Sequence, residues 1–257
     1  MIRIKNSGEI EAMRKVGRIT ADILGEICAA VKAGVTTWDL DQLAIEALKA
    51  RNAVGACYDY PGRSRPFPAH ICVSLNDEIV HGIPSKKRKI QSGDIVSLDF
   101  VAQYGGFMGD STRTVPVGEI SDDVKKLLDV TERALYAGIE QAIEGNHVGD
   151  ISFAVQCCAD EAGLGIVREL VGHGVGRDMH EEPSIPNYGQ KGTGPLLKAG
   201  MTLAIEPMFM LGSEKISVDT DGWTVRTADG KYAAHFEHTV LVTKDAPEIL
   251  TRYGVVS

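Results

Sequence analysis

The stretch SGDIVSLD at residues 92–99 has a close counterpart in AGMTLAIE at residues 199–206. Each stretch is a glycine turn followed by a largely apolar, β-prone run that ends in a carboxylate. A short apolar run after a turn signal is typical of a buried strand. We therefore expect two equivalent strands, which carry the acids Asp99 and Glu206 into the interior.

Other short segments repeat in the same order along the chain. The pair AG (33–34) and DL (39–40) matches EG (144–145) and DI (150–151), and HGIP (81–84) matches HEEP (180–183). Apolar residues at three- and four-residue spacing predict four helices, at about residues 7–32, 37–52, 121–144 and 149–163. The pattern predicts an α+β fold in which two pseudo-twofold duplicated helix-helix-strand halves, about residues 1–118 and 119–257, form a single domain.

Composition restricts the classes of function. With 257 residues, 44% of them hydrophobic, the chain can bury a large core, and its net charge of −8 disfavours binding to nucleic acid or anionic membranes. The basic run at residues 86–89 is interpreted as a solvated loop. No segment approaches the ~20 apolar residues of a membrane span, and the first residues do not resemble a signal peptide. We expect a cytoplasmic protein with no membrane contact and no specific nucleic-acid site.

Asp99 and Asp110 flank a predicted turn around residues 104–106. A hairpin centred between residues 104 and 105 would place the two aspartates directly opposite each other, with Cβ atoms ~5 Å apart. Two like charges at that distance are unfavourable unless positive charge lies between them. A pair of divalent cations would supply that charge.

The second half offers further metal-binding groups. Glu206 ends its strand, Glu237 lies in the alternating run HFEHTV at 235–240, and His173 lies between two glycines that let the backbone approach a ligand closely. Two divalent ions would neutralise the four carboxylates, and an oxygen-rich set with one imidazole suits Mn, Fe or Co better than a closed zinc site. Any one acid alone is more typical of a surface or cap, but matched repeat positions on apolar strands favour a metal site.

Eight segments, in this order along the chain, resemble type I methionine aminopeptidases of bacteria. They are VHGIP (80–84), SLD (97–99), GDST (109–112), GHGVGR (172–177), HEEP (180–183), IPNYG (185–189), IEP (205–207) and FEHT (236–239). The resemblance covers nearly the whole chain. It implies the pita-bread fold, in which the duplicated halves surround a central antiparallel sheet.

The same resemblance implies a catalytic centre with two divalent metal ions from the group Co, Mn, Fe, Zn and Ni. Its five ligands would be Asp99, Asp110, His173, Glu206 and Glu237, of which Asp110 and Glu237 would be shared by both ions. Glu206 would also move a proton toward the leaving amine. His81 and His180 would contact the substrate and steady its reacting groups.

A methionine pocket is the other implied feature. The family positions are filled here by Tyr60, Phe67, Cys72, Met179 and Trp223, with Cys57 close by. Members of the family commonly have Phe where this chain has Met179, so a flexible thioether replaces a ring. The loop at residues 61–66 is interpreted as an insertion at the pocket rim.

The implied function is removal of the initiator methionine from nascent polypeptides, with a preference for small second residues. The family further implies association with the ribosome, and we expect a monomer. An Xaa-Pro aminopeptidase or prolidase is an alternative with the same fold and ligands, although such enzymes usually carry a further N-terminal domain. Type II methionine aminopeptidases have a long insertion between the two glutamates, whereas a short stretch separates Glu206 from Glu237. A non-catalytic binding relative is the remaining alternative, but such proteins tend to lose ligands.

Overall fold

The computed structural model describes residues 1–62 and 64–253. In this part of the chain four helices form where the sequence predicts them: α1 (Ser7–Ala30), α2 (Thr37–Ala50), α3 (Asp122–Ile139) and α4 (Val148–Ala162). The predicted ends were too late, most clearly for α3, because Ala142 is buried in the loop beyond it and continues the apolar pattern. None of these helices combines the length and apolarity that crossing a bilayer requires.

The repeat at residues 39–40 and 150–151 marks two helix N-termini. Asp39 accepts the backbone N–H of Thr36 at 2.8 Å, and Asp150 accepts that of His147 at 2.7 Å. A carboxylate in the first helical turn satisfies a backbone donor that the helix leaves free, and its negative charge is favourable there. The repeat therefore preserves the start of the second helix in each half.

The strands of the described residues form four sheets. One has the order β1 (Val54–Gly55), β4 (Ile95–Tyr104), β2 (Cys72–Leu75), and β4 also pairs with β5 (Phe107–Pro116). The largest has the order β15 (Glu248–Ile249), β14 (His238–Leu241), β9 (Thr202–Ile205), β7 (Gly172–Gly174), β8 (Glu181–Ile185). The smaller two are β13 (Ala233–His235), β10 (Met208–Met210), β6 (Gly165–Ile166) and β11 (Ile216–Val218), β12 (Val225–Thr227), β3 (Glu78–Val80). The strands in these sheets all pair antiparallel.

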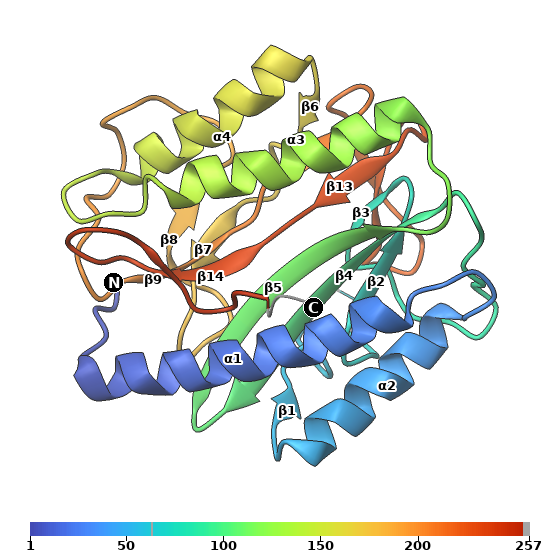
Figure 1. The fold of residues 1–257 in the computed structure, drawn as a ribbon, viewed down its shortest axis with the longest axis horizontal. Helices are drawn as coiled ribbons and strands as arrows, with labels where there is room; N and C mark the ends of the chain where they lie inside the picture. Colours follow the sequence, from blue (N-terminus) through green and yellow to red (C-terminus); the bar gives the residue numbers. More distant parts are fainter. Residues whose placement is uncertain (63, 254–257) are drawn as a thin grey trace.

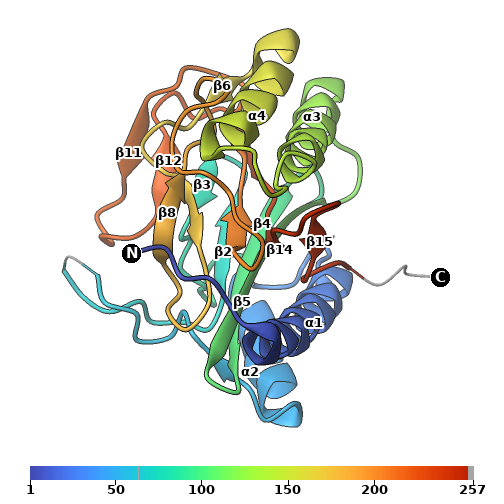
Figure 2. The ribbon, with the colours of Figure 1, turned by 90° about the vertical axis from the view of Figure 1, so that its left-hand side faces the viewer.

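The two halves meet where β5 runs beside the segment that leads into β14. Glu237 N donates to Thr112 O at 2.9 Å, and the Thr239 hydroxyl bonds the backbone of Asp110. Helices α1 and α2 lie on one side of the sheets and α3 and α4 on the other, as Figure 1 and Figure 2 show from two directions. Each helix pair covers its own buried core. The predicted α+β fold with two equivalent halves is confirmed.

The register of the first hairpin differs from the prediction by two residues. Asp99 lies opposite Thr112 and Asp110 opposite Val101, because residues 105–106 alone form the loop. Both loop residues are glycines with positive φ, 60° and 80°, as a two-residue type I′ turn requires. The prediction of directly opposite aspartates was therefore wrong. The two are diagonal neighbours and still point to one face, because side chains alternate along a strand.

Candidate metal centre

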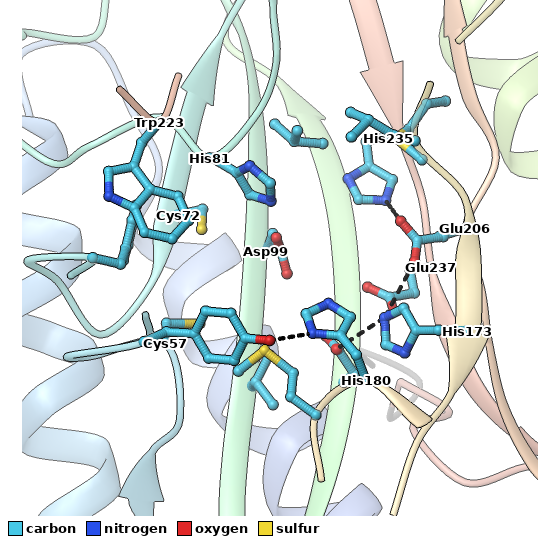
Figure 3. A pocket seen from close by; sticks show the side chains of 18 of the residues that line it. Cys57, Cys72, His81, Asp99, His173, His180, Glu206, Trp223, His235 and Glu237 are labelled. Atoms are coloured by element: carbon cyan, nitrogen blue, oxygen red, sulfur yellow. Dashed lines mark hydrogen bonds and ion pairs between the residues drawn. The ribbon is translucent and has the colours of Figure 1, made fainter. Parts of the chain in front are cut away.

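A cavity of ≈ 180 Å³ lies between the two halves' strands. Figure 3 places Cys57, Cys72 and Trp223 on one side of it and His173 and Glu206 on the other. The cavity therefore has an apolar side and a polar side. All the residues that the sequence predicted for the site line it: Tyr60, Phe67, Cys72, His81, Asp99, Asp110, His173, Met179, His180, Glu206, Trp223 and Glu237.

The four carboxylates come from two pairs of strands. Asp99 and Asp110 lie within β4 and β5, whereas Glu206 directly follows β9 and Glu237 directly precedes β14. Asp110 and Glu237 are only 4% and 2% exposed, and Asp110 Oδ1 and Glu237 Oε1 have no hydrogen-bond partner among the described residues. Buried acceptors without a donor are costly. These oxygens therefore fit a bound cation.

Burial and mutual repulsion both act on these acids. Burial, followed by the neighbouring charge of Glu237, raises the pKa of Asp110 well above its usual value. Burial and then Asp99 raise the pKa of Glu206, and burial and then Glu206 raise that of Glu237. A nearby positive charge favours the ionised form of a carboxyl group. Divalent cations in the cavity would therefore remove the repulsion.

His173 is oriented as a metal ligand would be. Its Nδ1 lies 3.0 Å from Gly174 O, and because a carbonyl only accepts, Nδ1 must carry the proton. The lone pair of Nε2 is then directed toward the acids, 3.4 Å from Glu206 Oε1 and 3.9 Å from Asp110 Oδ2. Ligand atoms of Asp110, His173 and Glu237 lie within 4.8 Å of one another. This group can hold a metal ion.

The repeated histidines face the same cavity from opposite halves. His81 follows β3 with a positive φ of 60°, and His180 precedes β8 at the exposed side of the cavity. The Tyr60 hydroxyl and His180 Nδ1 are 2.7 Å apart. Burial lowers the pKa of His81 to about 4 and also lowers the pKa of His180. Both imidazoles are therefore neutral near pH 7 and can exchange hydrogen bonds with a peptide.

The apolar side of the cavity is lined by aromatic rings, a thioether and thiols, which suit an uncharged side chain. Phe67 and Trp223 meet edge to face with ring centroids 5.2 Å apart. Met179, which departs from the family pattern, is 9% exposed and keeps this wall apolar. The buried members of the cluster include Cys57, Phe67, Cys72 and Met179, and Tyr60 and Trp223 pack against them.

The segment predicted as an insertion borders this wall. Trp223 Nε1 donates to Arg65 O at 3.1 Å, and a Cβ atom placed on Gly62 would come within 2.3 Å of the Trp223 ring. Arg63 lies outside the described residues. The backbone of this segment therefore fixes the tryptophan that closes the apolar side.

His235 is the polar cavity residue that sequence reasoning missed. It is 3% exposed, and its Nε2 lies 3.5 Å from Glu206 Oε2. Its position two residues before Glu237 was a usable signal, because residues at that spacing share a face of a strand. The other unpredicted lining residues are Cys57, which was placed near the pocket, and the apolar Val80, Val101, Leu170, Val171 and Met208.

Comparison with known proteins agrees with this geometry. A family model described as metallopeptidase family M24 matches residues 11–244. A methionine aminopeptidase from Clostridium acetobutylicum is 47% identical over 251 residues, which cover 98% of this chain and 99% of the relative. The crystal structure of a methionine aminopeptidase from Thermotoga maritima has a TM-score of 0.94 and 44% identity, with 98% of this chain and 100% of that chain covered.

More distant structures share the fold. A prolidase from Pyrococcus horikoshii has a TM-score of 0.77 at 22% identity, and the match covers 98% of this chain but 64% of the prolidase. At that identity the likeness concerns the fold alone. Together with the closer structural match, it confirms the predicted pita-bread fold.

Proposed function

The chain belongs to metallopeptidase family M24, and we propose that it removes the amino-terminal methionine of new polypeptides by metal-assisted hydrolysis. The observation that carries the proposal is the cavity, in which buried acids and a histidine lie opposite an apolar wall. The sequence identity of 47% over nearly the full length of a methionine aminopeptidase supports it. The enzyme is a metallo-aminopeptidase.

We propose that two divalent ions bind here, held by Asp99, Asp110, His173, Glu206 and Glu237. The net charge of four carboxylates supports two ions rather than one, and the oxygen-rich ligand set favours Mn, Fe or Co. When bound, such ions polarise the scissile carbonyl and make water a nucleophile near neutral pH.

The protein's own residues would bind the substrate and carry its proton. Glu206 is the proposed proton carrier, because its carboxylate borders the ligand group and burial raises its pKa above the usual value. His81 and His180 would bond the peptide from opposite sides of the cavity. The methionine side chain would lie against Phe67 and Trp223, where its thioether gains contact with aromatic rings.

The sites of action and assembly are further parts of the proposal. Nascent chains carry their initiator methionine where ribosomes make them, which places the enzyme in the cytoplasm. We also propose that the protein is a monomer. Association with the ribosome stays a prediction.

The test is hydrolysis of Met-Ala-Ser and of Ala-Pro-Ala by metal-stripped protein, with and without added Mn(II) or Co(II). We expect metal-dependent release of methionine from the first peptide and no cleavage of the second. Asp99→Ala should abolish the release. Cleavage only before proline would make the protein an Xaa-Pro peptidase, and metal binding without turnover would make it a binding protein.

A further inference from the structure

His235 borders the metal centre, yet the proposed mechanism gives it no part. It ends β13 and lines the cavity beside Glu206 (Figure 3). Neither ring nitrogen has a hydrogen-bond partner among the described residues. A buried polar group without a partner is costly, so an imidazole in such a position indicates a functional role.

The two imidazoles on either side of Glu206 differ in the position of their protons. His173 donates from Nδ1 to Gly174 O, so its Nε2 offers a lone pair, which can ligate a metal but cannot donate to a carboxylate. His235 has no such carbonyl at Nδ1 within the described chain. Its proton can therefore occupy Nε2, the nitrogen that faces Glu206.

Glu206 is held between these two rings. Its Oε1 lies 3.4 Å from His173 Nε2 and its Oε2 3.5 Å from His235 Nε2. His235 thus lies beside the other oxygen of the Glu206 carboxylate from the one that faces His173. This position makes it a neighbour of a proposed ligand.

We propose that His235 is a positioning residue whose Nε2–H donates to Glu206 Oε2 and so directs Oε1 toward His173 and the metal ions. This inference rests on the proposed function, in which Glu206 is both a ligand and the proton carrier. Partners of this kind fix the orientation of a ligating carboxylate and thereby its affinity for the metal.

Substitutions can separate a hydrogen-bond donor from a space filler. The amide of Gln reaches about the position of Nε2, whereas that of Asn reaches only that of Nδ1. We expect His235→Leu and His235→Asn to lower kcat by about 10–100-fold with little change in KM for Met-Ala-Ser, and to weaken Mn(II) binding by at least about tenfold. His235→Gln should keep most of both. His70→Gln, at a histidine outside the cavity, is the matched control and should behave as the unmodified protein.

The Mn(II) affinity is measured by isothermal titration calorimetry on each variant, after thermal melting has shown that it is folded. Unchanged affinity and kcat in His235→Leu would overturn the proposal, and so would equal losses in the Leu and Gln variants. If His235→Leu does not fold, the comparison of Gln with Asn decides. A wild-type protein that binds Mn(II) but releases no methionine would overturn the proposed function, whereas the role of His235 would still be judged by metal affinity.

Discussion

The unbroken hairpin of the first half contrasts with the interrupted hairpin of the second. Strands β4 and β5 pair over their full 10 residues, and Asp99 and Asp110 lie inside this ladder. In the second half the corresponding ladder is split in two, because β9 pairs with β14 and β10 with β13. Glu206 and Glu237 occupy the gap between the two pieces. One half thus presents its acids from a continuous ladder and the other from a break.

The break leaves the register intact. Ile205 lies opposite His238 before the gap, and Met208 lies opposite His235 after it, so both pieces follow one alignment. Pro207 lies in the gap, and a proline has no N–H to contribute to a ladder. The two glutamates therefore have backbone that is partly freed from their own sheet.

The difference indicates which half is fixed and which can adjust. Inside a continuous ladder the pleat sets the direction of each side chain, and the short aspartates have little freedom. At the gap the acids are one methylene longer, and Glu206 is oriented by the neighbouring histidines instead. We infer that the first half is a fixed wall of the metal centre and that the second half is the adjustable one.

Metal binding should require the acids of both halves. Their removal is the largest effect that we expect. Asp110→Asn and Glu237→Gln each remove one proposed ligand, from the first and the second half respectively. We expect each to lower kcat/KM for Met-Ala-Ser by at least about a thousandfold, because the charge stabilisation by a metal ion is worth several kcal/mol and 1.36 kcal/mol is a factor of ten. Mn(II) titration should show the loss of binding directly.

The control for this pair is Asp123→Asn, at an exposed acid in the first turn of α3. It should leave activity and Mn(II) affinity unchanged. If only the variant in one half lost activity, the metal ions would not be shared between the halves.

The same contrast explains what the sequence could predict. Apolar runs that end in an acid are local patterns, so they predicted the strands at residues 92–99 and 199–206 that bring Asp99 and Glu206 to the cavity. The pairing register depends on the turn geometry, and the turn at two glycines with positive φ differs from the predicted one, which moves the partner of Asp99 by two residues. His235 was missed because an isolated histidine on an apolar strand is usually a core residue. Its contact with Glu206 comes from the cross-strand register, in which Ile205 lies opposite His238 and Met208 opposite His235, and a local pattern does not show that register.

A buried ion pair with the N-terminal segment should stabilise the second, adjustable half. Lys5 Nζ lies 2.8 Å from Oε2 of Glu181, the residue after His180, and the two side chains are only 4% and 3% exposed. Removing one partner of a buried ion pair costs about 3–5 kcal/mol. Arg3 and a backbone N–H still contact Glu181, so we expect the lower end for Lys5→Met. That is a fall in Tm of roughly 6–12 °C, at about 2–4 °C per kcal/mol.

Arg14→Met is the matched control for this substitution. Arg14 pairs with Glu248, but these side chains are 42% and 39% exposed. An exposed pair contributes about 0–1 kcal/mol, so the fall in Tm should be at most a few degrees. Equal falls in Tm for the two variants would show that the Lys5–Glu181 ion pair contributes no more than a surface ion pair.

Repulsion between the buried acids of the two halves should also affect how the stability of the metal-free protein depends on pH. Burial, followed by the like charge of Glu237 and Asp99, raises the pKa of Asp110 in the folded state. The folded state then holds a proton that the unfolded state releases, so this contribution to stability is lost as pH rises from the unfolded value through the folded value. In EDTA, Asp110→Asn should therefore be more stable than the unmodified protein and have a higher Tm. Its advantage in the free energy of unfolding should grow as pH rises above about 4, by at most about 1.4 kcal/mol per pH unit.

Saturating Mn(II) reverses the order in this experiment, because it stabilises only the protein that can bind it. Measuring Tm at each pH with and without Mn(II) separates the two effects. A Tm difference in EDTA that shrinks as pH rises would contradict repulsion between the walls.

The smallest effect is expected at the tip of the fixed wall. Gly105 has a φ of 60°, and nothing lies within 4 Å of a Cβ atom placed there, so Gly105→Ala meets only a conformational penalty. We expect a cost of about 1 kcal/mol, or roughly 2–4 °C in Tm, and a smaller cost for Gly105→Asn, because Asn tolerates a left-handed backbone. Mn(II) affinity and kcat should stay unchanged in both variants, since Asp99 and Asp110 lie well inside the ladder. Weaker Mn(II) binding in Gly105→Ala would show that strain at the turn reaches the acids, and the first half would then be no more rigid than the second.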